Sequence, residues 1–316
     1  MSVQVDAVLD AAGPALAERM ARVEERLAAA ADWATGALAE HARATIAAGG
    51  KRLRPMLVFL AAGEAAPDGD DGLIRAAAAV ELVHSATLVH DDVLDGSALR
   101  RGRPTVVAAA GRDMAVAVGD LLFSRAFAEL VRNARIDEVR VLSEASSALA
   151  AGELLQREDA WRPDVSVERY LLRCELKTAR LFEAACELGA LEAGGPARAL
   201  GAFGRRIGLA FQLLDDVLDV SGPPERTGKP RGTDLLDGTV TLPFIVARER
   251  DGELPHPREI RTPEQAAAAC DRITATGALE DVRTRALEMV AEAKAALPRA
   301  DRALELVADG VVDRYA

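Results

Sequence analysis

The chain has 316 residues, half of them hydrophobic and only 3% aromatic, and it carries a formal net charge of −11. A protein this acidic is a poor candidate for general binding to nucleic acid or to an anionic membrane surface. Ala and Leu are abundant, whereas Ile, Tyr, Phe and Trp are scarce, and this bias favours helix over sheet. The composition therefore predicts an all-α protein, and the simplest expectation is one helical domain over residues 1–316.

The three cysteines, Cys174, Cys186 and Cys270, lack the spacing of metal ligands. A sparse and odd set of this kind is typical of reduced thiols in a cytosolic protein. The first residues lack the basic start and apolar core of a signal peptide, and we find no run of ~18 apolar residues. We therefore expect a cytoplasmic protein without a transmembrane segment.

Helical periodicity extends through most of the chain. Residues 16–40 are expected to form one or two helices, with a solvated face that includes Glu18, Arg19, Glu24, Glu25 and Arg26. Further helices are predicted over 54–64, 73–95, 113–132, 137–157, 166–190 and 196–219, and from Leu242 onward with breaks near Pro255 and Pro263. Gly and Pro place loops at 67–72, 100–105 and 221–234, and no β-hairpin signal is found.

The pentapeptide Asp-Asp-Val-Leu-Asp occurs twice, at 91–95 and at 215–219. Each copy follows an apolar, helix-compatible stretch, so residues four apart would lie on one face. Carboxylates gathered there repel each other unless cations lie between them, and at a helix C-terminus they oppose the helix dipole. One such pair is usually a solvated face, but two copies indicate Mg²⁺ held between carboxylates and phosphate oxygens.

Basic residues lie close to both copies, beside glycines. Lys51, Arg52 and Arg54 follow a Gly-Gly pair, the first copy is followed by Arg100, Arg101 and Arg103, and the second by Lys229 and Arg231. Lys177 and Thr178 interrupt another apolar helix. Arg and Lys beside flexible backbone are typical of a diphosphate site, because glycines let the backbone approach the phosphate.

Two histidines lie on the helix of the first copy, and the residues alone leave their roles open. His84, two turns before Asp91, could donate a hydrogen bond to an anion or be a buried core histidine. His90 could support the metal site or be structural.

Further motifs follow one another in a fixed order. They are GlyGlyLysArgLeuArgPro (49–55), HisSerAlaThrLeuValHisAspAspValLeuAsp (84–95), ArgArgGlyArgProThr (100–105), GlyAsp (119–120), GlyGluLeuLeuGln (152–156), LysThrAla (177–179), PheGlnLeuLeuAspAspValLeuAsp (211–219) and GlyLysProArgGlyThrAspLeuLeuAspGlyThrValThrLeuPro (228–243). With this ordered set the chain resembles the trans-isoprenyl diphosphate synthases, or polyprenyl synthetases. The motifs span most of the chain and are far more specific than a lone Asp-rich motif.

The resemblance implies an all-α isoprenoid synthase fold with a deep central cavity and the two Asp-rich motifs facing each other across its mouth. It also implies residue roles. Isopentenyl diphosphate would be held by Lys51, Arg54, His84 and Arg101. The allylic diphosphate would be held by Arg100, Lys177, Thr178, Gln212 and Lys229. Mg²⁺, as three ions with substrate bound, would be ligated by Asp91, Asp95 and Asp215, supported by Asp92, Asp216 and Asp219.

These roles suit a carbocation reaction. Metal ions and basic side chains would neutralise the departing diphosphate so that the allylic C1–O bond ionises. The cation needs an apolar cavity that excludes water, and Thr178 would help to stabilise it. The double bond of isopentenyl diphosphate then attacks, and a proton is lost to the released diphosphate, so no strong side-chain base is needed.

The small residues Ala86 and Thr87, five and four positions before Asp91, favour a long product because an aromatic residue there would stop chain growth. On the next helix, Ser124 is small and Phe123 is a deeper barrier. We expect an all-trans product in the hexaprenyl to decaprenyl range for a quinone side chain, made by a homodimer. The alternative is a geranylgeranyl or farnesyl diphosphate synthase.

Two other classes fit the residues less well. A terpene cyclase also ionises allylic diphosphates with an Asp-rich motif, but it binds a single diphosphate and does not need the site at 49–55. An inactive subunit that sets product length for a partner would be expected to lose Asp or Arg ligands, and this chain keeps them.

Overall fold

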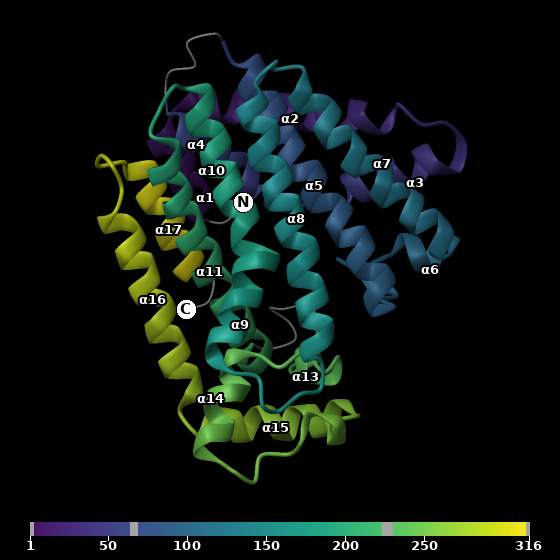
Figure 1. The fold of residues 1–316 in the computed structure, drawn as a ribbon, viewed down its shortest axis with the longest axis vertical. Coiled ribbons are helices and arrows are strands. Elements are labelled where there is room, and N and C mark those ends of the chain that lie inside the picture. Colours follow the sequence, from purple (N-terminus) through teal and green to yellow (C-terminus); the bar gives the residue numbers. More distant parts are fainter. Residues whose placement is uncertain (1–2, 64–68, 223–229, 314–316) are drawn as a thin grey trace. The chain divides into compact units, whose positions relative to one another are not determined.

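The structure is a computed structural model that describes residues 3–63, 69–222 and 230–313. It confirms the all-α prediction (Figure 1). The α-helices are α1 (Val3–Ala12), α2 (Pro14–Ala31), α3 (Gly36–Ala47), α4 (Leu53–Ala62), α5 (Asp71–Asp95), α6 (Val106–Ala110), α7 (Arg112–Val131), α8 (Ile136–Asp159), α9 (Val167–Cys174), α10 (Arg180–Glu192), α11 (Ala197–Ser221), α13 (Thr233–Leu236), α14 (Leu242–Arg250), α15 (Pro263–Ala275), α16 (Ala278–Ala295) and α17 (Arg302–Asp313). A π-helical turn, η1 (Glu175–Ala179), lies between α9 and α10, and a 3-10 turn, η2 (Pro257–Glu259), precedes α15.

The internal contacts divide the chain into two compact units, and the expectation of one domain over 1–316 stays a prediction. The first unit comprises residues 1–146, 181–204 and 297–306, and the second comprises 147–180, 205–296 and 307–316. The first Asp-rich motif belongs to the first unit and the second motif to the second.

In the first unit, α5 packs lengthwise against α7 (Figure 1). Its alanine run, Ala76–Ala79, is fully buried, and such short side chains let neighbouring helices approach closely. Gly189 of α10 serves the same purpose, because a Cβ there would lie 1.9 Å from the Val58 carbonyl oxygen of α4. Close packing of this kind fixes the position of α5, which carries the first motif at its C-terminal end.

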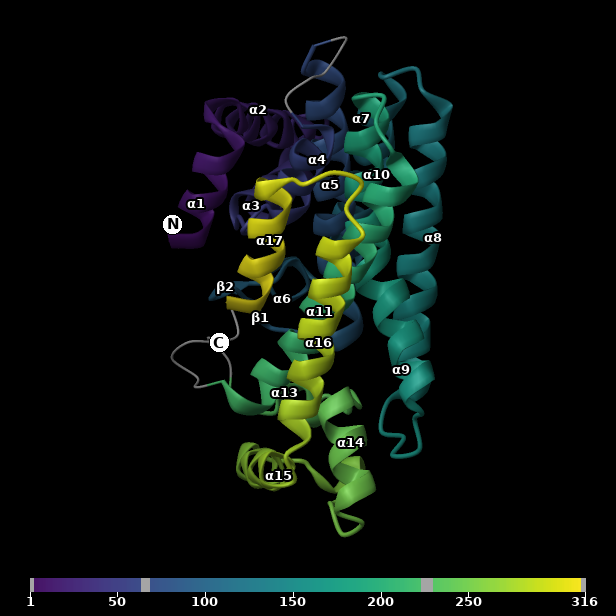
Figure 2. The same ribbon diagram turned by 90° about the vertical axis from the view of Figure 1, so that its left-hand side faces the viewer.

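In the second unit, α9 begins at an N-cap, where the Ser166 side chain accepts a hydrogen bond from the Arg169 amide. The π-turn η1 then interrupts the helix at the predicted Lys177–Thr178 position. The lower part of this unit consists of α14 and α15, which pack against each other and against α16 (Figure 2). Pro263 is the first residue of α15, where proline lacks only an amide that would have no partner anyway.

Most predicted helices are confirmed within a few residues, and residues 16–40 form two helices, α2 and α3. The solvated face predicted for α2 is wrong at Arg19. That side chain is buried and donates two hydrogen bonds to Asp70 and one to the Gly63 carbonyl. A partner 51 residues away turns an exposed charge into a buried one, and helical periodicity carries no sign of it.

The structure contains a β-hairpin for which the sequence gives no signal. Strands β1 (Leu99–Arg100) and β2 (Arg103–Pro104) pair antiparallel around Arg101 and Gly102 (Figure 2). Both central residues have positive φ, 52° and 73°, as a tight two-residue hairpin requires. Two-residue strands show no alternation of apolar and polar residues, so the pattern that predicts hairpins was absent.

Among the described residues, α5 is the one helix whose length and apolar composition would allow it to cross a membrane, and 72% of its apolar stretch is buried inside the protein. The core helix of a globular protein has the same properties.

Candidate functional site

The first Asp-rich motif ends α5, and its three aspartates differ in exposure. Asp91 is half-buried and Asp95 is exposed, whereas Asp92 is buried. Asp92 accepts a hydrogen bond of 2.9 Å from Arg100 Nε and forms an ion pair with Arg100 Nη2 at 2.7 Å. The β1–β2 hairpin therefore binds back onto the motif, and it brings Arg100 beside the carboxylates.

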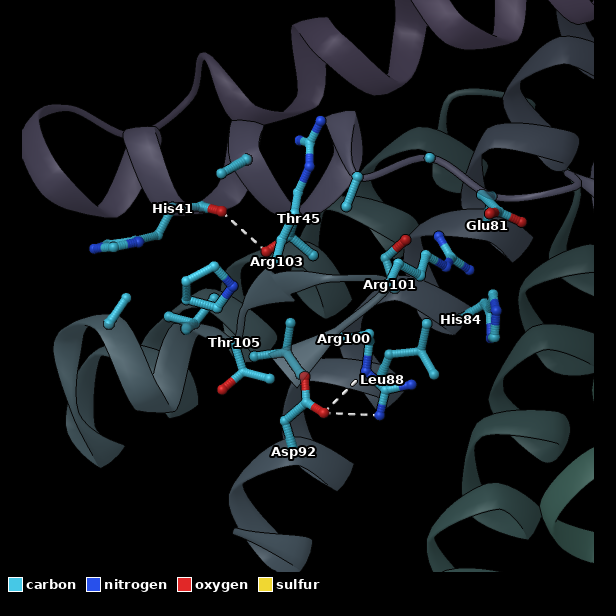
Figure 3. A pocket seen from close by; sticks show the side chains of 18 of the residues that line it. His41, Thr45, Glu81, His84, Leu88, Asp92, Arg100, Arg101, Arg103 and Thr105 are labelled. Carbon is cyan, nitrogen blue, oxygen red and sulfur yellow. Dashed lines mark hydrogen bonds and ion pairs between the residues drawn. The ribbon is translucent and has the colours of Figure 1, made fainter. Parts of the chain in front are cut away.

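A pocket of about 340 Å³ lies beside this motif, entirely within the first unit. Its walls come from α3, the loop before α4, α5, the hairpin and α6. Figure 3 shows Glu81, His84 and Arg101 grouped at one end, with His41 and Thr105 at the other. The structure thus brings together His84, Arg100 and Arg101, three of the residues that the sequence assigned to diphosphates, around one basic hollow.

The loop before α4 completes the basic side of this pocket. Arg52 has a left-handed backbone, with φ of 48°. Gly50 faces the Arg101 guanidinium so closely that a Cβ would lie 3.0 Å from its Nη2 atom. Gly50 of the sequence motif therefore leaves room for the Arg101 guanidinium beside the loop. Lys51, between them, is exposed.

Arg54 and His84 are held in unusual electrostatic surroundings. The Arg54 guanidinium stacks on the Phe182 ring, 4.7 Å from its centroid, and its buried Nε has no hydrogen-bond partner among the described residues. Burial lowers the pKa of Arg54 to about 10. Burial, and then the charges of Arg54 and Arg101, lower the pKa of His84 well below its ordinary value. A neutral His84 that faces the pocket can donate one ring N–H to an anion.

Glu81 is the pocket residue that sequence reasoning missed. It is buried on α5 and accepts a hydrogen bond of 2.8 Å from Arg52 Nη1. Burial raises its pKa, while the nearby charges of Arg52, Arg54 and Arg101 lower it. Its position one turn before His84 on α5 was the available signal, but a lone acidic residue in an apolar helix does not reveal three arginine neighbours.

His90 packs against the Gly119–Asp120 motif of α7. Its Nε2 lies 3.4 Å from an Asp120 carboxylate oxygen, and a Cβ on Gly119 would lie 2.1 Å from the same nitrogen. The glycine therefore makes room for the imidazole, and the aspartate orients it. His90 joins α5 to α7 immediately before the motif.

The second motif lies on α11, in the second unit, and its surroundings are different. Asp215 is exposed, whereas Asp216 is buried. Asp216 accepts hydrogen bonds from the Tyr170 hydroxyl at 2.6 Å and from Gln212 Nε2 at 2.8 Å. Thr178 in turn donates to Gln212 Oε1 at 2.7 Å. Burial raises the pKa of Asp216 to about 7, although both donors act against that shift.

Lys177 and Thr178 are neighbouring residues of the π-turn η1. Lys177 forms an ion pair with Glu153 of α8, and a Cβ on Gly152 would lie 2.5 Å from the Lys177 amide nitrogen. Gly152 of the GlyGlu motif therefore allows α8 to pack directly against the wider π-turn. Asp219 accepts a hydrogen bond from the Asp234 amide at 3.3 Å. Lys229 lies outside the described residues.

The predicted chain-length residues all lie in the first unit. Ala86 is fully buried on α5, and the Thr87 hydroxyl donates to the His84 carbonyl at 2.8 Å. On α7, the Phe123 ring is half-buried and lies 5.5 Å from the Phe127 ring, and Ser124 is exposed. The roles of these four residues in chain length stay predictions.

No three His, Cys, Asp or Glu side chains form a ready-made metal site within residues 3–63, 69–222 and 230–313. The three cysteines are free and buried, as expected for reduced thiols.

The chain is almost entirely helical, with two aspartate-bearing helices and a basic pocket beside the first. Solved structures of polyprenyl synthases share this architecture, the isoprenoid synthase fold. Residues 36–271 match the family model described as Polyprenyl synthetase. The chain therefore belongs to the polyprenyl synthetase family of prenyltransferases, which confirms the resemblance seen in the motifs.

Named relatives agree with this assignment. The chain is 42% identical to heptaprenyl diphosphate synthase component 2 of Geobacillus stearothermophilus over 73% of each chain. It is 39% identical to geranylgeranyl diphosphate synthase of Methanosarcina mazei over 80% of each chain. A crystal structure of polyprenyl synthase from Caulobacter crescentus, complexed with calcium and isoprenyl diphosphate, matches with a TM-score of 0.88 and 39% identity, covering 97% of this chain and 98% of that one.

Proposed function

We propose that this chain joins isopentenyl diphosphate head-to-tail to an allylic diphosphate, with Mg²⁺, and makes an all-trans polyprenyl diphosphate of hexaprenyl to decaprenyl length for a quinone side chain. The observation that carries the proposal is the basic pocket formed by His84, Arg100 and Arg101 beside the first Asp-rich motif. A neutral histidine and clustered guanidinium groups are suitable donors for a diphosphate.

We assign isopentenyl diphosphate to Lys51, Arg54, His84 and Arg101. The partnerless Nε of Arg54 supports this assignment, because a buried donor is stabilised when an anion accepts from it. Arg100, Lys177, Thr178, Gln212 and Lys229 are assigned to the allylic diphosphate. The hydrogen bond from Thr178 to Gln212 supports the assignment of these two residues to the same site.

The carboxylates fit Mg²⁺ by their chemistry. Their oxygens are hard donors, which suit this ion together with water and phosphate oxygens. We assign Asp91, Asp95 and Asp215 as ligands of three ions. We assign Asp92, Asp216 and Asp219 as supports; each accepts a hydrogen bond within the protein. When bound, Mg²⁺ supplies neutralisation of the departing diphosphate.

The side chains of this protein then have separate tasks. Arg100 and Lys177 add positive charge beside the leaving diphosphate. The Thr178 hydroxyl donates a hydrogen bond to Gln212, so the lone pairs of its oxygen are available to an allylic cation. The proton lost after coupling passes to the released diphosphate, which removes the need for a strong side-chain base.

Incubation of the purified chain with farnesyl diphosphate, isopentenyl diphosphate and Mg²⁺, followed by chromatography, tests the proposal. Products of 30 to 50 carbons are expected. Accumulation of a 20-carbon product would contradict the long-chain proposal and favour the geranylgeranyl alternative, which the Methanosarcina mazei relative supports. Absence of turnover by the chain alone would point to a second subunit.

Product length is tested by Ala86→Phe, which should shorten the product if this wall stops chain growth. Because Ala86 is fully buried, the substitution also strains packing. Ala269→Phe, at a buried alanine of α15, is the matched control for that strain. An unchanged product length in Ala86→Phe would place the limiting wall elsewhere.

We further propose a cytoplasmic homodimer. Four large apolar side chains of the first unit, Trp33, Leu99, Val131 and Ile136, are more than half exposed, and contact with a second copy would cover side chains of this kind. The three reduced thiols support a cytoplasmic location. Light scattering after size-exclusion chromatography should give twice the monomer mass of 33.4 kDa.

A further inference from the structure

Arg52 makes most of its hydrogen bonds to protein groups, although it lines the basic pocket. Its guanidinium donates to Glu24 at 2.6 and 3.0 Å, to Glu81 at 2.8 Å and to the Ile46 carbonyl at 3.1 Å. A guanidinium has five N–H groups, so four of its donors are committed within the protein. Arg52 therefore has a structural role and is not assigned to substrate binding.

Two arginines beside the pocket, Arg52 and Arg101, have left-handed backbones. Such a conformation costs a non-glycine residue free energy and persists only where the surroundings hold it. Arg52 is held by its hydrogen bonds, and the charge of Glu81 attracts both arginines. The carboxylate of Glu81 is thus the common counter-charge of the two loops that form the basic walls.

Glu81 also interacts with Arg54. Without a carboxylate at this buried position, the repulsion among Arg52, Arg54 and Arg101 would be uncompensated from within α5. Figure 3 shows the Glu81 carboxylate at the same end of the pocket as His84 and Arg101. An ordered cluster of cations binds an anion better than a mobile one, because less order must be created on binding.

We propose that Glu81 is a positioning residue for the diphosphate of isopentenyl diphosphate: its hydrogen bond fixes Arg52 in the pocket wall, and its charge balances the charges of Arg54 and Arg101. This inference rests on the function proposed above. Glu81 touches no substrate atom in this role and acts through the arginines.

The test is Glu81→Gln, which keeps the size of the side chain and removes its charge. We expect the KM for isopentenyl diphosphate to rise about tenfold or more, with the KM for the allylic substrate and kcat nearly unchanged. Isothermal titration with inorganic diphosphate, without metal or allylic substrate, should show a similar loss of affinity. That second readout does not require turnover, so it remains valid if the proposed activity is absent from the wild-type chain.

The matched control is Glu129→Gln. Glu129 is a buried carboxylate of α7 that pairs with Arg26 and Arg125, and it does not line the pocket. The Glu129→Gln variant should be less stable than the wild-type chain, with neither KM changed. Equal KM effects in the two variants, or equal effects of Glu81→Gln on both substrates, would overturn the proposal.

Tighter binding of inorganic diphosphate by Glu81→Gln would also overturn it, because Glu81 would then be a competing anion. Should Glu81→Gln fail to fold, Glu81→Asp keeps the charge but shortens the side chain by one methylene. Its affinity for inorganic diphosphate should be reduced, and wild-type affinity would contradict a role that depends on position.

Discussion

The two Asp-rich motifs share five residues, yet the buried aspartate of each is held by different chemistry. Asp92, on α5, accepts from the Arg100 guanidinium, a full positive charge. Asp216, on α11, accepts from two neutral donors, Tyr170 and Gln212. An ion pair stabilises the charged carboxylate, whereas neutral donors in a buried site do so only partly. The same sequence thus gives two aspartates with different electrostatic character.

The two motifs are also linked to different neighbours. Arg100 links the first motif to the hairpin that also carries Arg101 toward the basic pocket. The second motif is linked through Gln212 to Thr178 in the π-turn. We infer that the first motif acts with the pocket proposed to bind isopentenyl diphosphate, and the second with the residues proposed to bind the allylic diphosphate.

The largest expected effect is the loss of the proposed metal ligands themselves. Asp91→Ala and Asp215→Ala should each lower kcat/KM by about 10²–10³-fold. Each variant lacks a proposed ligand of the Mg²⁺ that neutralises the leaving diphosphate. Steady-state kinetics over a range of Mg²⁺ concentrations provides the measurement. Asp113→Ala, at an exposed aspartate in the first turn of α7, is the control and should retain wild-type activity.

A strong loss in only one of the two variants would break the comparison, since it would show that the motifs do not share the task of binding metal.

A smaller effect should distinguish the buried aspartates, measured by urea unfolding without metal. Asp92→Asn removes one partner of an ion pair and should lower the free energy of unfolding by about 1–3 kcal/mol. Asp216→Asn removes a charge that burial disfavours, and it should cost less. Equal losses in the two variants would contradict the electrostatic difference between the motifs.

The pH dependence of the same measurement sharpens the result. The folded protein keeps a proton on Asp216 up to about pH 7, whereas an unfolded aspartate releases it near pH 4, roughly the ordinary value. The folded state therefore binds more protons in this window, and the contribution of Asp216 to wild-type stability should decrease as pH rises through it. That decrease should be absent in Asp216→Asn, and its persistence would assign it to another group.

The smallest effect is expected from Tyr170→Phe, which removes a single hydroxyl from a fully buried side chain. Loss of the hydrogen bond to Asp216 should cost about 1 kcal/mol in unfolding free energy. It should also weaken activation by Mg²⁺ without changing the KM for isopentenyl diphosphate. A change in the KM for isopentenyl diphosphate would instead show that Tyr170 affects the binding of that substrate, which would contradict the comparison.

Much of the fold could be predicted from the sequence, because helical periodicity and the positions of Gly and Pro are local properties. The helices now seen as α4, α5, α7, α8 and α11 were predicted within a few residues. Helix α1 and the hairpin at 99–104 were not predicted. The hairpin is held by Arg100 against Asp92, a contact that no local pattern of residues announces.

The candidate site shows the same division. The Asp-rich motifs, Arg100, Arg101, His84, Lys177 and Thr178 were recognised from the sequence because each belongs to a motif. Glu81 and Tyr170 were missed, since their significance comes from partners 29 and 46 residues away. Glycines of the GlyAsp and GlyGlu motifs were recognised as motif members, but their purpose, room for His90 and for the π-turn, became visible only in the packing.

The sequence by itself determined the helical class, the family and the candidate residues for metal and diphosphate, because these depend on residue type, order and local spacing. The tertiary structure alone decided which charges neutralise each other. Buried carboxylates and guanidinium groups must find partners wherever the folded chain brings them, and for Glu81 and Asp216 those partners are distant in the chain. Identical pentapeptides consequently acquired different neighbours, and with them different electrostatic roles.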